Sequence, residues 1–213
     1  MKRFLQTCAT LACVALPSVA TAHPHIFIET GLKPVLDDTG RLIGIEVSWR
    51  YDELYSLLVL EDKGLDHDYD GKLTEDEMSR LKGFDQNWVD GYAGDLFIHQ
   101  GEAELTLGPP EGRGTSFEDG KITSIHYRRI EGAAPGHPWL LQAYDPTYYT
   151  AYDLGLGVDA PEGCEVKVTQ ADLDRAYTLV EEALYATPAD PEGNFPEVGE
   201  AFADKVELSC VSG

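Results

Sequence analysis

The chain has 213 residues and a formal net charge of −22, from 38 acidic and 16 basic side chains. This excess of negative charge repels phosphate backbones, which argues against nucleic acid as a partner, and it attracts divalent cations. Because 43% of the residues are hydrophobic and no low-complexity tract interrupts them, we expect a globular chain with one core.

The N-terminus has the pattern of a secretory signal peptide. Lys2 and Arg3 precede an apolar run that ends near Val19 and is too short to span a membrane. Ala20-Thr21-Ala22 supplies the small residues of a cleavage site. We therefore expect residues 1–22 to be a signal peptide and residues 23–213 to form a single periplasmic domain with no direct membrane anchor.

Two strands and a helix are expected next. Ile26 to Thr30 resembles a strand, and residues 37–40 form a turn before a second strand. The second strand alternates like a half-buried strand of an antiparallel sheet, with one face made of Ile43, Ile45, Val47, Trp49 and Tyr51. Helical spacing then follows at Leu54, Leu57, Leu58 and Glu61.

Residues 66–77 match the calcium loop of an EF-hand, in an insertion of about residues 52–83. The expected calcium ligands are Asp66, Asp68 and Asp70, the backbone carbonyl of Lys72, Thr74 directly or through water, and Glu77 with both oxygens. Gly71 allows the left-handed turn at the sixth position. Thr74 to Glu77 also forms a capping box that starts the exit helix. The alternative is an acidic surface loop that holds no ion.

Strands return from Leu96 onward. Residues 96–99 and 103–107 flank Gln100-Gly101, while residues 115–118 and 121–130 flank Asp119-Gly120, a pair that favours a type I′ hairpin. Two more strands are expected at residues 139–144 and 165–168. The fold class is therefore α+β, mainly an antiparallel sheet or sandwich, with an inserted helix–calcium loop–helix and a C-terminal helix.

The C-terminal helix is expected to be capped by Thr169 with Asp172 and to end before Pro188. Its helical spacing is carried by Leu173, Ala176, Tyr177, Val180, Ala183 and Leu184. Cys8 and Cys13 would leave with the signal peptide. Cys164 and Cys210 remain, and two cysteines in an exported domain predict one disulfide.

Signal cleavage would place His23-Pro24-His25 at the mature N-terminus. A free amine beside an imidazole chelates nickel, cobalt, zinc or copper. Pro24 blocks the square-planar mode that uses deprotonated backbone amides, because its nitrogen carries no hydrogen. His23 and His25 are therefore the candidate transition-metal ligands, with remote donors possible at His99, His126 and His137. A buried, hydrogen-bonding His25 is the alternative.

Tyrosines gather around Asp145-Pro146, at Tyr144, Tyr148, Tyr149 and Tyr152. Amphipathic rings of this kind line ligand surfaces or pack across a sheet, and we favour packing.

Several segments together resemble a known family. They are the His-Pro-His start, residues 49–53 with Tyr55-Ser56, the acidic loop, residues 117–120, residues 144–148 and the segment from Phe202-Ala203 to Cys210. These look like the bacterial periplasmic family catalogued as domain of unknown function 1007. The resemblance implies a periplasmic component of a transport system that accompanies nickel, cobalt or zinc transporters, with His23, His25 and the acidic loop as its metal contacts.

The expected function is therefore that of a periplasmic calcium-binding protein, accessory to transition-metal transport, that binds metal through its mature N-terminus. Its partners would be metal ions and an inner-membrane metal transporter. One alternative is a calcium-stabilised secreted interaction module, and another is a copper-dependent oxidative enzyme. No Gly-x-Ser-x-Gly or His-Glu-x-x-His pattern occurs, and we expect no catalytic residues.

Overall fold

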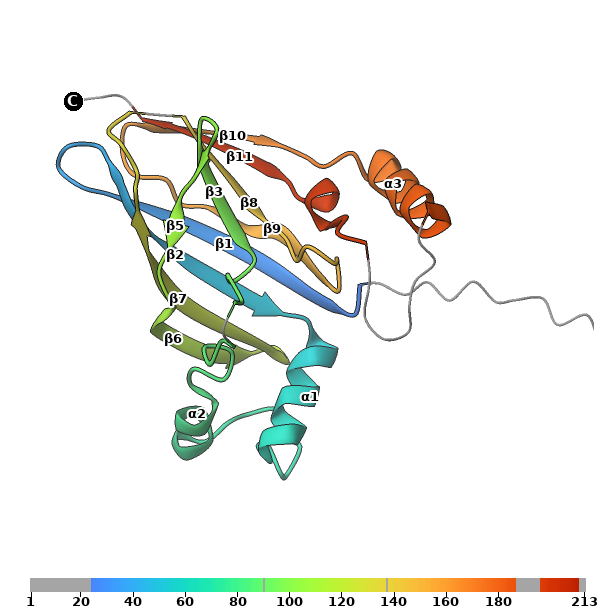
Figure 1. The fold of residues 1–213 in the computed structure, drawn as a ribbon. Helices are drawn as coiled ribbons and strands as arrows, with labels where there is room; N and C mark the ends of the chain where they lie inside the picture. The colour runs from blue at the N-terminus through green and yellow to red at the C-terminus, as the bar shows by residue number, and fades with distance from the viewer. Residues whose placement is uncertain (1–23, 90, 137, 187–195, 211–213) are drawn as a thin grey trace, which may run out of the picture.

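The structure is a computed structural model that describes residues 24–89, 91–136, 138–186 and 196–210. The expected signal peptide, His23 and His137 lie outside these residues. The described chain is mostly β-sheet with three α-helices, so the α+β fold class is confirmed (Figure 1).

The first sheet is built on a hairpin of β1 (Ile26–Leu36) and β2 (Leu42–Tyr51). Its strand order is β5-β7-β2-β1-β9, and β6 also pairs with β7. The remaining strands are β5 (Thr106–Leu107), β6 (Glu111–Glu118), β7 (Lys121–Glu131) and β9 (Thr150–Val158). All pairs in this sheet are antiparallel except β1 with β9, which is parallel.

The second sheet has the order β10-β11-β8-β3-β4, and its pairs are all antiparallel. Its strands are β3 (Leu96–Gln100), β4 (Ala103–Glu104), β8 (Trp139–Ala143), β10 (Cys164–Thr169) and β11 (Lys205–Cys210). One hydrophobic core joins the two sheets, with Val47 of β2, Leu141 of β8 and Leu208 of β11 almost fully buried. The expected inward face of β2 is confirmed at Ile45, Val47, Trp49 and Tyr51, which are buried, whereas Ile43 is only partly buried.

The helices lie at two separate places (Figure 1). α1 (Glu53–Lys63) and α2 (Glu75–Leu81) lie together at the lower end of the first sheet, while α3 (Leu173–Ala186) lies beyond the ends of β10 and β11. A short 3₁₀ turn, η1 (Gly199–Phe202), precedes β11. Among the described helices, none is long and apolar enough to cross a membrane.

Two turns and caps show how local sequence sets these boundaries. Asp119 and Gly120 both have positive φ, 51° and 76°, so the type I′ hairpin between β6 and β7 is confirmed. The expected Thr169 cap is wrong, because Thr169 ends β10. Asp172 caps α3 instead, and its Oδ1 accepts a hydrogen bond of 3.0 Å from the Arg175 amide.

The expected strand at residues 103–107 is wrong as one element. Ala103–Glu104 pairs with β3, whereas Thr106–Leu107 pairs with β7 in the other sheet. Leu105, between them, is 4% exposed. The chain therefore crosses from one sheet to the other at a buried leucine, a change that residue alternation does not reveal.

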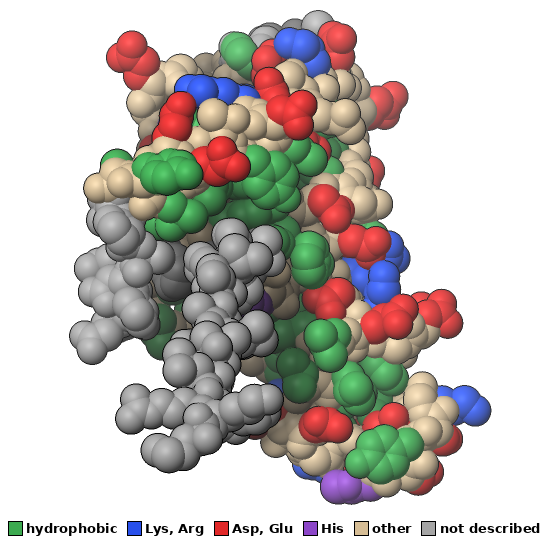
Figure 2. All heavy atoms as spheres, turned by 90° about the vertical axis from the view of Figure 1, so that its right-hand side faces the viewer, with side chains coloured by type: hydrophobic (Ala, Val, Ile, Leu, Met, Phe, Trp, Pro, Cys, Tyr) green, Lys and Arg blue, Asp and Glu red, His purple; other side chains and the backbone are tan. Residues whose placement is uncertain are grey.

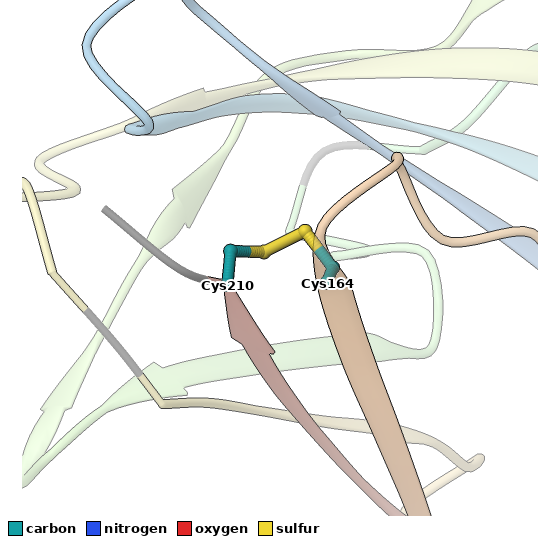
Figure 3. The surroundings of a disulfide bond; sticks show 2 residues. All are labelled: Cys164 and Cys210. Atoms are coloured by element: carbon teal, nitrogen blue, oxygen red, sulfur yellow. A yellow bond between two sulfur atoms is a disulfide. The ribbon is translucent and has the colours of Figure 1, made fainter. Parts of the chain in front are cut away.

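The predicted disulfide between Cys164 and Cys210 is confirmed (Figure 3). The two cysteines are direct partners across the antiparallel pair of β10 and β11, and 46 positions separate them in the chain. The bond therefore fastens the end of the last strand to the edge strand of the second sheet.

The tyrosines near Asp145 mostly pack, as the structural interpretation expected. Tyr144 stacks on Phe97, and Tyr148 stacks on Phe202 with ring centroids 3.7 Å apart. The hydroxyl of Tyr152 donates to Asp95 at 2.8 Å. Tyr149 differs, since 46% of it is exposed.

Candidate functional site: an acidic loop between two helices

The acidic loop begins where α1 ends. Gly64 stops the helix in a left-handed conformation with φ 60°, and α2 begins at Glu75. Asp66, Asp68 and Asp70 each place one carboxylate oxygen so that the three atoms lie within 4.8 Å of one another. Within the described ranges, this is the one group of three or more His, Cys, Asp or Glu side chains so arranged.

Hydrogen bonds inside the loop fold it around these carboxylates. Asp66 Oδ1 accepts from the Asp70 amide at 3.1 Å, and Asp66 Oδ2 accepts from the Gly71 amide at 3.3 Å. Asp70 Oδ1 accepts from the Lys72 amide at 2.8 Å. Gly71 has φ 72°, as the EF-hand pattern requires, and Tyr69 shares this left-handed conformation with φ 54°. The loop is thus curved by its own aspartates.

Glu77, the last residue of the pattern, joins the end of the loop to its beginning. Glu77 Oε1 accepts from the Asp66 amide at 2.9 Å, while Oε2 accepts from the amide and the hydroxyl of Thr74 at 2.9 and 2.7 Å. The Thr74 amide and hydroxyl, together with the Asp66 amide, hold the pKa of the Glu77 carboxyl below its usual range. Glu77 is therefore ionised and next to Asp66, although outside the group of three aspartates.

Thr74 has a structural role of its own. It is the N-cap of α2, and its Oγ1 accepts from the Glu77 amide at 3.3 Å, so the predicted capping box is confirmed. The Lys72 side chain is exposed, as expected for a residue that would contribute only its carbonyl. Of the six expected ligands, the structure brings three aspartates together and places Glu77 beside the first.

Contacts with the core and between the helices hold the loop in place. Leu65 is 4% exposed, and Leu73 packs against the main core. Arg80 of α2 reaches back to the end of α1, where its Nη2 donates to the Lys63 carbonyl at 2.5 Å. The calcium-loop pattern does not include Arg80, which sequence reasoning missed. The one feature of the sequence that could have indicated this contact is an arginine in the second helix, since arginine side chains often bind the free carbonyls at a helix end.

His25, which the sequence predicts as a transition-metal ligand together with His23, lies at the surface. Its alternative reading as a buried histidine is wrong, because the residue is exposed. Its ring lies 4.9 Å from that of Tyr149, and its amide donates to the Tyr149 carbonyl at 2.9 Å. The start of β1 is thereby tied to the turn before β9, and His23 falls outside the described residues.

The histidines considered as remote donors have other surroundings. His99 Nε2 lies 3.7 Å from a carboxylate oxygen of Glu104 on the neighbouring strand. His126 is 1% exposed, and its ring meets the indoles of Trp49 and Trp88, which stack on each other. His137 is not among the described residues. None of these histidines belongs to the ligand group found in the described chain.

A buried polar network beside His126 was not predicted. Asp85 Oδ2 accepts from the hydroxyls of Tyr51 and Ser124, the former at 2.8 Å. Asp95 Oδ2 accepts from Tyr92 and Tyr152 at 2.9 and 2.8 Å. These residues come from β2, β7, β9 and the chain between α2 and β3, so sequence spacing offers no signal for their meeting.

Burial shifts the acid–base properties of this network. Burial, aided by the positive charge of Arg128, lowers the pKa of His126 to about 4. Burial raises the pKa of Asp95 to about 6, against hydrogen bonds from Tyr152 and Tyr92 that lower it. The Arg128 guanidinium is itself held by three carbonyls, those of Ala93, Leu107 and Gly108. Three buried atoms of this region, Asp85 Oδ1 and both ring nitrogens of His126, have no hydrogen-bond partner among the described residues.

Comparison with known proteins adds a family but no activity. The family model described as "Protein of unknown function (DUF1007)" matches residues 8–210. An uncharacterized protein of Haemophilus influenzae is 23% identical over 205 residues, which cover 89% of this chain and 91% of that protein.

Proposed function

The chain belongs to the DUF1007 family of proteins of unknown function, and on that premise we propose that it is a periplasmic calcium-binding protein whose loop from Asp66 to Glu77 holds one calcium ion. The observation that carries the proposal is the convergence of the Asp66, Asp68 and Asp70 carboxylates within 4.8 Å. Calcium takes six to eight oxygen ligands, so hard carboxylates on a left-handed loop suit it.

The donor set fits calcium better than a softer metal. Its side-chain atoms are carboxylate and hydroxyl oxygens, whereas zinc, nickel and copper favour nitrogen or sulfur. Three neighbouring carboxylates repel one another, and a dication relieves that repulsion. Asp66, Asp68 and Asp70 would hold the ion, Glu77 would join them from its place beside Asp66, and the Lys72 carbonyl and Thr74 would complete the shell.

The ion would act as a brace between α1 and α2. Asp66 follows the end of α1, and Glu77 belongs to α2, so one ion bound to both would tie the two helices together. A ligand that binds only the folded state adds about 2.7 kcal/mol of stability when its free concentration is a hundred times its dissociation constant. We propose this structural role rather than a regulatory one.

The direct test is calorimetric titration of calcium into the protein and two matched variants. Asp68→Asn removes one ligand charge at a side chain for which no hydrogen bond is found among the described residues. Asp38→Asn removes one charge from the exposed turn between β1 and β2. The proposal predicts one strong site in the wild type and in Asp38→Asn, and at least tenfold weaker binding in Asp68→Asn. Equal binding by all three would contradict it.

We further propose that the protein is an accessory to nickel, cobalt or zinc transport, with His23 and His25 as its transition-metal ligands and an inner-membrane transporter as its partner. Two observations favour an N-terminal metal site. His25 is exposed, and its hydrogen bond to Tyr149 fixes the point where the chain enters β1. The disulfide is compatible with export to an oxidising compartment, where a mature chain starting at His23 would arise.

Nickel titration of the mature protein tests this second proposal. His25→Ala should weaken nickel binding at least tenfold, whereas His99→Ala, at a partly exposed histidine of β3, should leave it unchanged. If the wild type binds nickel no more tightly than His25→Ala does, the transition-metal proposal is wrong. The protein would then be a calcium-stabilised module without a transition-metal role.

A further inference from the structure

The outer face of α1 is apolar and exposed. Leu54, Leu57 and Leu58 are 65%, 45% and 52% exposed, and their spacing places them on one side of the helix. The other side buries Ser56 and Leu60. Three adjacent exposed leucines on an 11-residue helix are costly to leave in water, because such surface is normally removed from it.

This surface continues into a groove at the acidic loop. The groove has a volume of about 320 Å³, and its apolar lining is Leu57, Leu60, Leu65 and Tyr69. Glu61, Asp66 and His67 also line it. Tyr69 is 76% exposed at its rim. We call Leu54, Leu57, Leu58 and this groove the α1 surface.

A further apolar side chain lies at the start of the helix. Phe27 is 52% exposed, and its amide donates to Asp52, the N-cap of α1, at 2.9 Å. Figure 2 shows hydrophobic side chains on the lower part of this face, over α1 and the loop, with carboxylates among them. Apolar contact area and negative charge therefore occur together.

The charge identifies the kind of partner. Residues 52–63 carry four carboxylates, at 52, 53, 61 and 62, none of them a proposed calcium ligand, against a single lysine at 63. A second copy of the chain, with a net charge of −22, would be repelled, and anionic lipid headgroups would be repelled as well. A segment with apolar side chains on one side and Lys or Arg beside them matches both features.

We propose that the α1 surface is a docking site for an apolar, cationic segment of a partner protein. The leucines contact the apolar side of that segment, and the carboxylates around them attract its basic residues. Asp66 and Tyr69 belong to both the groove and the acidic loop, so calcium that fixes the loop also fixes the groove. This dependence on calcium rests on the proposed function, whereas the docking itself does not.

The test uses a fluorescent 14-residue helical peptide of leucine and lysine, with leucines on one side, and a matched peptide with serine in place of leucine. Binding is measured by anisotropy in 0.15 M salt with 1 mM calcium. The leucine peptide should bind at least tenfold more tightly than the serine peptide. The double variant Leu57→Ser/Leu58→Ser should lose at least tenfold of the affinity for the leucine peptide.

Two controls make the result specific to α1. Leu184→Ser removes a leucine of α3 with 40% exposure and should change affinity less than twofold. Variant folding is checked by the melting temperature, which exposed positions should leave almost unchanged. Equal binding of the two peptides, or equal loss in the α1 and α3 variants, would overturn the proposal.

Removing calcium separates this inference from the proposed function. Calcium chelation should weaken peptide binding to the wild type and leave binding to Asp68→Asn unchanged. Calcium binding without peptide binding overturns the docking site alone. Peptide binding that depends on Leu57 and Leu58 but not on calcium supports the docking site and overturns its dependence on calcium.

Two other occupants would also overturn the proposal. Sedimentation velocity should show a monomeric wild type. Self-association that Leu57→Ser/Leu58→Ser abolishes would instead assign this face to a second copy of the chain. Co-flotation with phosphatidylcholine vesicles that the same variant abolishes would assign it to a lipid surface. The proposal predicts a wild-type protein that neither self-associates nor floats.

Discussion

The imidazole of His126 lies edge-on to the indole of Trp49, with ring centroids 4.6 Å apart and an interplanar angle of 66°. The indole of Trp88 meets the same imidazole at 85° with a centroid distance of 5.7 Å. Neither ring nitrogen of His126 has a hydrogen-bond partner in the described part of the chain. This aromatic site accommodates a neutral imidazole and disfavours an imidazolium.

The first prediction concerns acid sensitivity at His126. Because its pKa is lowered to about 4 in the folded protein, His126 contributes stability that is fully present above pH 6.5 and lost as the pH falls towards 4. The loss is about 3 kcal/mol. His126→Phe lacks this titration, so the difference in free energy of unfolding between variant and wild type should grow by that amount from pH 7 to pH 4.

Urea denaturation followed by tryptophan fluorescence measures this difference. A constant difference between His126→Phe and wild type would show that His126 does not titrate abnormally.

Asp95 should act in the opposite direction. Its pKa is raised to about 6, so it contributes stability that is fully present below pH 3.8 and lost as the pH rises through 6. Asp95→Asn keeps an oxygen acceptor for Tyr92 and Tyr152 but cannot ionise, and asparagine tolerates the φ of 48° at this position. Relative to this variant, the wild type should lose about 2 kcal/mol between pH 4 and pH 7.

The same urea experiment at several pH values checks this prediction. If Asp95→Asn and wild type keep a fixed stability difference across that range, the Asp95 carboxyl ionises normally within the fold.

Calcium should raise the melting temperature through the acidic loop. A gain of about 2.7 kcal/mol at a hundredfold excess over the dissociation constant corresponds to about 5–10 °C for a chain of this size. Scanning calorimetry with calcium or chelator should show this shift in wild type and in Asp38→Asn, but little of it in Asp68→Asn. Identical melts with and without calcium would remove the bracing role.

Reduction of the disulfide between Cys164 and Cys210 should destabilise the fold. The bond closes a loop with a sequence separation of 46, for which chain entropy allows a stabilisation of up to about 4 kcal/mol. The double variant Cys164→Ser/Cys210→Ser should therefore unfold at lower urea concentration than the oxidised wild type. Reductant should shift the wild type to the variant's midpoint and leave the variant unchanged. A wild-type midpoint insensitive to reductant would contradict this.

Features set by local chemistry could be predicted from the sequence. The alternation in β2, the Asp119-Gly120 hairpin, the helix start at Thr74 and the left-handed Gly71 each depend on neighbouring residues. The disulfide followed from the count of cysteines left after the expected cleavage. The gathering of three aspartates followed from the spacing of the EF-hand pattern.

Features set by tertiary contacts could not be predicted. Helical spacing at Leu54, Leu57 and Leu58 normally marks a buried face, yet α1 buries Ser56, whose hydroxyl accepts from the Ile122 amide at 3.0 Å. The sequence did not predict strand β9, because its tyrosines, aspartates and glycines do not alternate between apolar and polar residues. The strand is stabilised by its parallel pairing with β1, which sequence spacing does not reveal. The Asp85 and Asp95 networks likewise depend on strands that meet only in the fold.

Native mass spectrometry of the protein isolated from its own compartment reports the start of the chain and its bound ions together. We expect a disulfide-bonded chain of 191 residues, which is 213 minus 22, beginning at His23 and carrying one calcium ion. A chain that retains its first 22 residues, or a mature chain that carries no calcium, would contradict it.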